Sequence, residues 1–153
     1  MKIATIILSL FLTSCMISSK HYTGPERSAD ELAILFNSEL GSPVQINEIN
    51  GKFRGVGYVK KFEFLPGEVS ILAAYNPADK PNPGKLDLEC DVSFVPLTFM
   101  AKANTKYKID YEIGRSNWTV WVKEENSNKI VSKKQTGKIK TKSGKFLIDL
   151  GLK

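Results

Sequence analysis

The sequence predicts an all-β protein, specifically an antiparallel β-sandwich of about eight short strands. Polar and apolar residues alternate along several segments between positions 44 and 150, which is the period of a half-buried strand. Turn signals such as Asn50-Gly51, Pro66-Gly67 and Ser143-Gly144 separate these segments at short intervals. Sustained helical periodicity is absent, so we expect the 153-residue chain to form one β-rich domain.

The chain begins with the pattern of a secretory signal peptide, which we place at residues 1–14. Lys2 supplies a positive charge, and residues 3–12 form an apolar stretch about half as long as the ~20 residues of a membrane-spanning helix. Leu12-Thr13-Ser14-Cys15 resembles a lipobox, which implies that the Cys15 thiol accepts a diacylglycerol and that cleavage precedes it. An acyl chain such as palmitate is then added to the new amino group. The alternative is an ordinary secreted protein with a chance cysteine.

Two or three acyl chains hold a protein stably on a membrane, whereas a single chain binds only marginally. Met16 stands where aspartate is the familiar signal for retention in the inner membrane. The resemblance therefore implies the cell outer membrane of a Gram-negative host, facing the periplasm. We predict a lipidated tether at residues 15–21 and a β-sandwich domain at residues 22–153. Residues 16–21 span at most about 20 Å, so the domain stays near the membrane surface.

The first elements of the domain contain one ambiguity. Ser28-Ala29-Asp30-Glu31 has the spacing of a helix capping box, but residues 31–36 form a compact apolar run that is equally typical of a buried strand. The residues alone leave both open, and only the family resemblance given below favours the strand. Residues 44–49 and 52–53 predict a hairpin around Asn50-Gly51, because a type I′ turn needs positive φ at both central residues.

The middle of the chain predicts three more strands. Residues 58–65 lead into Pro66-Gly67, the signature of a type II turn, and residues 68–75 continue with Val69, Ile71, Ala73 and Tyr75 on one face. Residues 76–85 contain three prolines and predict a loop. In residues 86–94 the apolar positions, which include Cys90 and Phe94, alternate with polar ones, so we expect a buried and inert Cys90 thiol.

The last third of the chain predicts three hairpins. Pro96 suggests a bulge or an edge position, and residues 97–103 and 106–113 read as the first hairpin. Residues 118–124 and 129–133 flank a polar turn and form the second. Residues 138–142 and 145–150 form the third, with Phe146, Ile148 and Leu150 toward the core.

The order of these motifs resembles an uncharacterised family of small Gram-negative outer-membrane lipoproteins. The shared features are the lipobox, Tyr22-Thr23-Gly24-Pro25-Glu26-Arg27, residues 32–36, Ile49-Asn50-Gly51-Lys52, Leu65-Pro66-Gly67, residues 97–107, and Trp118-Thr119-Val120-Trp121-Val122. The chain departs from the family pattern at Glu68, where a histidine is frequent. The resemblance implies a β-sandwich, similar to small transthyretin-like sandwiches, and an envelope location, but it supplies no activity.

The charge of the chain favours anionic neighbours. The formal net charge is +6 at pH 7, which suits lipid head groups, lipopolysaccharide or an acidic envelope protein, and we expect no nucleic-acid partner for an exported lipoprotein. Lys138, Lys140 and Lys142 fall on one face of their predicted strand. They either blunt an exposed sheet edge or contact an anionic surface.

Trp121 is the other candidate contact residue. If Trp118, Val120 and Val122 face the core, then Trp121 points outward, where an exposed tryptophan suits a protein or sugar contact. The alternative is that a loop or the C-terminal hairpin covers it.

Catalytic chemistry has little support. The single histidine, His21, falls in the predicted tether, so it suits neither a catalytic triad nor a metal site. The carboxylates Asp87, Glu89, Asp91, Asp110 and Glu112 lie on polar strand faces. We expect no catalytic residue, metal or cofactor, and a binding or structural role in the envelope. The alternatives are an accessory or inhibitor module for another envelope protein and a minor hydrolase that uses surface carboxylates.

Overall fold

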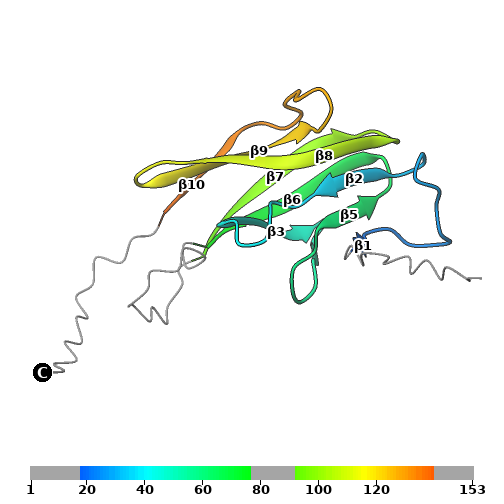
Figure 1. Ribbon diagram of the computed structural model, residues 1–153, viewed down its shortest axis with the longest axis horizontal. Helices are drawn as coiled ribbons and strands as arrows, with labels where there is room; N and C mark the ends of the chain where they lie inside the picture. The colour runs from blue at the N-terminus through cyan, green and yellow to red at the C-terminus, as the bar shows by residue number, and fades with distance from the viewer. Residues whose placement is uncertain (1–17, 77–91, 140–153) are drawn as a thin grey trace, which may run out of the picture.

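The computed structural model describes residues 18–76 and 92–139, and in this part of the chain it is all-β, with no helix (Figure 1). The predicted fold class is confirmed, and the described residues form ten strands in two sheets. The strands are β1 (Ser18–Lys20), β2 (Ala33–Phe36), β3 (Val44–Ile49), β4 (Lys52–Phe53), β5 (Lys61–Phe64), β6 (Gly67–Tyr75), β7 (Ser93–Ala101), β8 (Thr105–Ile113), β9 (Asn117–Glu124) and β10 (Gln135–Lys138).

The two sheets have interleaved connections. A six-stranded sheet has the order β1-β5-β2-β8-β9-β10, and a four-stranded sheet has the order β4-β3-β6-β7. Most neighbours are antiparallel, but β1 with β5 and β2 with β8 are parallel, so the expectation of a purely antiparallel sandwich is wrong for these two pairs. Parallel neighbouring strands need a crossover connection. For β2 and β8, the chain between them includes all four strands of the second sheet.

The core lies between the sheets and draws one face from each strand that contributes to it. In β6 the predicted inward face is confirmed, because Val69, Ile71, Ala73 and Tyr75 are all buried. The largest fully buried side chain is Trp118 of β9, whose ring stacks on Tyr75 at 5.6 Å between centroids. Its indole Nε1 donates to Ser93 Oγ at 3.1 Å, so the one polar atom of this buried ring has a partner.

The ambiguous segment at residues 28–36 is a turn followed by a strand, as we favoured. The backbone N–H and the hydroxyl of Ser28 donate to Glu31 Oε2 at 3.1 and 2.8 Å, and the N–H of Glu31 donates to the Ser28 carbonyl at 3.1 Å. Only the first of these is a capping-box contact, and together they close a turn and start no helix. β2 then enters the six-stranded sheet, where Ala33 and Leu35 are fully buried. Pairing on both sides with β5 and β8 selects the extended conformation.

The turn chemistry is confirmed at the first hairpin. Asn50 and Gly51 have φ of 50° and 73°, and Ile49 pairs with Lys52, as the type I′ interpretation requires. Gly67 also has a positive φ, 135°, but this lies beyond the roughly 80° of a type II turn. The Pro66-Gly67 link serves a different purpose, because it carries the chain from β5 in one sheet to β6 in the other.

Other local pairings predicted from the sequence are wrong. β7 and β8 do not form a hairpin, because β7 pairs with β6 in the four-stranded sheet while β8 joins the six-stranded one. Pro96 does lie on an edge strand, as expected, but β7 continues through it without a break. Phe94 is half exposed and lies outside the core, because the buried face of β7 is formed by Val95, Leu97, Phe99 and Ala101.

The pairing of the C-terminal strands also differs from the pairing that the sequence predicted. β9 pairs with β8 along Tyr107 to Ile113 and with β10 on its other side. The predicted hairpin at residues 118–133 is reduced to one bridge between Lys123 and Ile130 beside β9. The predictions for residues 77–85, for Cys90 and the rest of residues 86–91, and for Phe146, Ile148 and Leu150 lie outside the described residues.

We expect Gly137→Ala to destabilise the fold. A Cβ at this position of β10 would lie 2.4 Å from Trp118 Nε1 and 2.7 Å from Val95 Cγ2, both of which belong to buried side chains. Overpacking of this kind costs about 1–3 kcal/mol in the free energy of unfolding. Urea denaturation would measure it, with the neighbouring exposed Lys138→Ala as the control. A Gly137→Ala protein as stable as that control would contradict the packing around Trp118.

Candidate functional site

The functional candidate with the clearest structural basis is the N-terminal strand β1. Ser18, Ser19 and Lys20 pair in parallel with Lys61, Phe62 and Glu63 of β5, at one edge of the six-stranded sheet. Residues that we predicted to be tether are therefore part of the sheet. Their sequence carries no apolar alternation, and this is why sequence analysis missed the strand.

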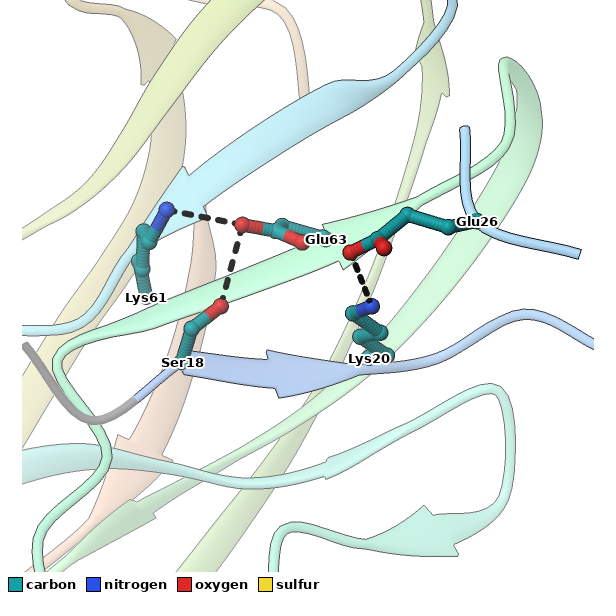
Figure 2. Close-up of polar contacts among 5 residues, drawn as sticks. All are labelled: Ser18, Lys20, Glu26, Lys61 and Glu63. Carbon is teal, nitrogen blue, oxygen red and sulfur yellow. Dashed lines mark hydrogen bonds and ion pairs between the residues drawn. The ribbon is translucent and has the colours of Figure 1, made fainter. Parts of the chain in front are cut away.

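Polar side chains fasten β1 to β5, as Figure 2 shows. Glu63 Oε1 accepts from Ser18 Oγ at 3.0 Å and from Lys61 Nζ at 2.7 Å, so one carboxylate oxygen joins both strands. The Lys61 and Glu63 side chains are only 23% and 15% exposed. The second ion pair, Lys20 with Glu26 at 2.8 Å, is 51% and 81% exposed, so water screens it far more strongly.

The Glu63 carboxylate is held in its charged form. Burial acts to raise the pKa of Glu63, but the hydrogen bonds from Lys61 and Ser18 and the charges of Lys61 and Lys20 lower the pKa below its ordinary value of 4.5. A depressed carboxyl pKa means that the contact contributes its stability above the ordinary pKa and loses it as the pH falls through the folded-state value.

His21 extends this attachment, which corrects the prediction of a plain tether residue. Its backbone N–H donates to the Glu63 carbonyl at 2.7 Å, and its ring packs edge-on against Phe62 at 5.5 Å between centroids. Burial, and then the charge of Lys52, lower the pKa of His21 below 6.5. The imidazole is thus neutral near pH 7 and serves as a packing group.

The predicted attachment residue Cys15 lies outside the described residues, but the sequence limits its distance from the fold. Only three peptide steps separate Cys15 from Ser18, the first residue of β1. Three extended residues span about 10 Å. The attachment point at Cys15 therefore lies within about that distance of the start of β1, at the end of the sheet where β5 begins with Lys61.

Trp121 lies outside the core cluster, and of the two possibilities left open for it, exposed or covered, the structure shows the covered one. Trp121 is 6% exposed, and Lys134 Nζ lies over its ring at 3.9 Å from the centroid. The segment after β9 covers it, which was the alternative, and the cation–π contact with Lys134 stabilises this cover. Trp121 therefore offers no free surface for a sugar or a partner protein.

Lys138 is exposed on β10, the strand at the opposite edge of the six-stranded sheet from β1 (Figure 1). Five inter-strand spacings separate these edges, on the order of 24 Å. This position fits a lysine that blunts an edge strand better than one held near the predicted anchor. Lys140 and Lys142 lie outside the described residues.

Of the carboxylates considered as catalytic candidates, the two that the structure describes each lie next to a lysine. Asp110 pairs with Lys123, and Glu112 lies 3.9 Å from Lys134. Asp87, Glu89 and Asp91 lie outside the described residues. Within residues 18–76 and 92–139, no group of three or more His, Cys, Asp or Glu side chains is arranged to hold a metal ion. In that same part of the chain, no helix has the length and apolar character to cross a membrane.

A shallow groove of about 570 Å³ lies between residues 36–43 and β8. Its polar groups mostly hold the fold together. Asn37 is buried, donates from Nδ2 to the Val59 carbonyl at 3.0 Å, and accepts at Oδ1 from the N–H groups of Ser38 and Ile46. Ser42 Oγ and Tyr111 Oη share a hydrogen bond of 2.7 Å. No sequence pattern marked Asn37 as a polar link between the two sheets.

Comparisons with protein-family models, with curated proteins and with solved structures found no match to this chain. The resemblance to small outer-membrane lipoproteins therefore stays a prediction from the motifs.

We expect the attachment of β1 to weaken in acid in two steps. Because the pKa of His21 and the pKa of Glu63 are both lowered, protonation favours release of β1, first below about pH 6.5 and then below about pH 4.5. Hydrogen exchange of the His21 amide, which bonds to the Glu63 carbonyl, would report this release.

Glu63→Gln should remove only the second step, and it should lower the protection of the His21 amide at pH 7 about tenfold, the equivalent of about 1.5 kcal/mol, which is the lower end for a hydrogen bond to a charged group. Glu26→Gln is the matched control, because its ion pair is exposed. Equal effects of the two variants would contradict the role of Glu63.

Proposed function

We propose that this protein is a non-catalytic lipoprotein of the bacterial outer membrane, that it faces the periplasm, and that its domain has a binding or structural role in the envelope. The observation that supports this best is the short distance between the lipobox cysteine and the fold. Cys15 precedes β1 by three residues, and β1 is a hydrogen-bonded member of the six-stranded sheet. Lipid on Cys15 would therefore hold the whole domain at the membrane surface.

The partly buried Glu63 contact adds to this proposal. A long flexible linker lets a domain tumble freely, whereas a strand fastened three residues from the lipid restricts its orientation. One face of the domain is then always turned to the membrane, and another face is always turned to the periplasm. A protein with a binding or structural role gains from such a fixed presentation.

The placement of the acid–base residues also favours a non-catalytic role. His21 packs against Phe62 beside β1, and Asp110 and Glu112 are each engaged by a lysine. A general base must have its lone pair free toward a substrate, whereas these two carboxylates face lysine ammonium groups. A role as accessory or inhibitor module for another envelope protein uses the same anchored domain.

Mass spectrometry of the mature N-terminus tests the proposal. We expect the chain purified from its host membranes to begin at Cys15 and to carry diacylglycerol and an added acyl chain, and we expect Cys15→Ser to yield no acylated form. An unacylated Cys15 or an uncleaved leader in the wild-type protein would contradict the proposal.

The choice of membrane has its own test. Density separation of the two membranes should place the wild-type protein in the outer-membrane fraction. Met16→Asp should move it to the inner-membrane fraction, since aspartate after the lipidated cysteine is the retention signal that the resemblance implies. Recovery of both proteins in the same fraction would contradict the proposed location.

A further inference from the structure

The segment 52–61 forms an exposed loop at the corner of the sandwich where β1 begins. It runs from β4 to β5, and its last residue, Lys61, pairs with Ser18 of β1. Lys52 lies close enough to His21 to lower the pKa of that ring. Figure 1 shows the chain between β3 and β5 projecting from the sandwich on the side where β1 lies. The loop and the predicted lipid attachment therefore share one corner of the molecule.

The tip of this loop is unusual in its chemistry. Val56 is 99% exposed and lies between Gly55 and Gly57, which have φ of 98° and 87°. Exposed turns favour glycine, asparagine, aspartate and serine, and a β-branched apolar side chain at the tip of one loses free energy in water. Phe53, at the start of the loop, is a second exposed apolar residue, at 57%.

The base of the loop is held firmly. The N–H of Arg54 donates to the Asn47 carbonyl at 3.0 Å, and the N–H of Asn37 donates to the Lys60 carbonyl at 3.0 Å. Tyr58 Oη donates to the Ser38 carbonyl at 2.9 Å, and Arg54 Nη1 also donates to the Gly57 carbonyl. These hydrogen bonds fix the conformation of the turn that carries Val56, so the exposure of Val56 follows from the structure of the loop.

The charged residues within this loop segment all have one sign. Residues 52–61 contain Lys52, Arg54, Lys60 and Lys61 and no carboxylate. Lys61 is neutralised by Glu63, whereas Lys52 and Lys60 are exposed and take part in none of the ion pairs among the described residues. Two carboxylates lie beside the loop: Glu48 of the neighbouring strand lies opposite Phe53, and the pKa of Tyr58 is raised by burial and then by the charge of Glu39. Apolar side chains framed by cations match the chemistry of an anionic membrane surface.

We propose that the 52–61 loop is a second membrane contact, in which Val56 and Phe53 enter the interfacial region and Lys52, Arg54 and Lys60 bind anionic phospholipid head groups. This inference rests on the proposed lipid anchor at Cys15, since the roughly 10 Å reach of residues 15–18 brings the bilayer to this corner. The loop then fixes which edge of the sandwich faces the bilayer.

A depth measurement on the acylated full-length protein tests this. A nitroxide or an NBD fluorophore is attached at Val56→Cys in a Cys90→Ser background, because Cys15 is blocked by lipid and Cys90 is the remaining thiol. The protein is reconstituted into phosphatidylethanolamine–phosphatidylglycerol vesicles. The matched control is Met100→Cys, which is 62% exposed on β7, the edge strand farthest from β4 in the four-stranded sheet.

We expect membrane-embedded quenchers to reach the probe at position 56 several-fold more than the probe at position 100. The double variant Lys52→Glu, Lys60→Glu should lower the equilibrium constant for membrane contact of the loop, read from quenching at position 56, about fivefold for each lysine. The control double variant Lys133→Glu, Lys138→Glu should leave that quenching unchanged. Raising the salt from about 0.1 to about 0.5 M should weaken the contact, because screening shortens the range of these charges.

The outcomes separate the two proposals. Acylated protein with equal quenching at positions 56 and 100, or with no response to the Lys52 and Lys60 reversals, overturns the loop contact and leaves the lipid anchor standing. A mass spectrum of the same preparation without lipid on Cys15 overturns the anchor, and the loop contact falls with it.

Discussion

The four residues of β2 hold the six-stranded sheet together. β2 pairs with β5 on one side and with β8 on the other, so within the described residues it is the link between the N-terminal pair β1–β5 and the C-terminal strands β8, β9 and β10. Its inward side chains, Ala33 and Leu35, are fully buried, while Ile34 and Phe36 are partly covered on the other face. A strand with neighbours on both sides and cover on both faces needs apolar residues throughout, and this explains the unbroken apolar run in the sequence.

The fold class was predictable because it depends on local signals. Alternation in β6 and β9, together with the Asn50-Gly51 turn, identified strands whose inward residues the structure confirms. Partner choice was not predictable, because it depends on which sheet a strand joins. β7 and β8 are close in sequence and separated by a short link at residues 102–104, yet they enter different sheets, since each buries its apolar face from the opposite side of the same core. Local turn chemistry alone contains no information on that choice.

Among the functional features, too, those that depend on a local pattern could be predicted, and those that depend on contacts between distant residues could not. The lipobox is a chemical pattern in the sequence, and it stays a prediction because Cys15 lies outside the described residues. The attachment of β1 depends on a hydrogen bond between residues 45 positions apart, Ser18 and Glu63, which no local pattern marks. Trp121 shows the converse case. Strand periodicity placed it outside the core correctly, but its cover by Lys134 comes from the path of the chain after β9.

The parallel pairing of β1 with β5 has a mechanical consequence. A force that pulls the N-terminal end along the strand axis loads the backbone hydrogen bonds of the pair in shear, so they must rupture together. A force directed sideways peels the strand one bond at a time, beginning at Ser18. The polar fastening at Glu63 involves that same first residue, and it strengthens the joint at the point where peeling would start.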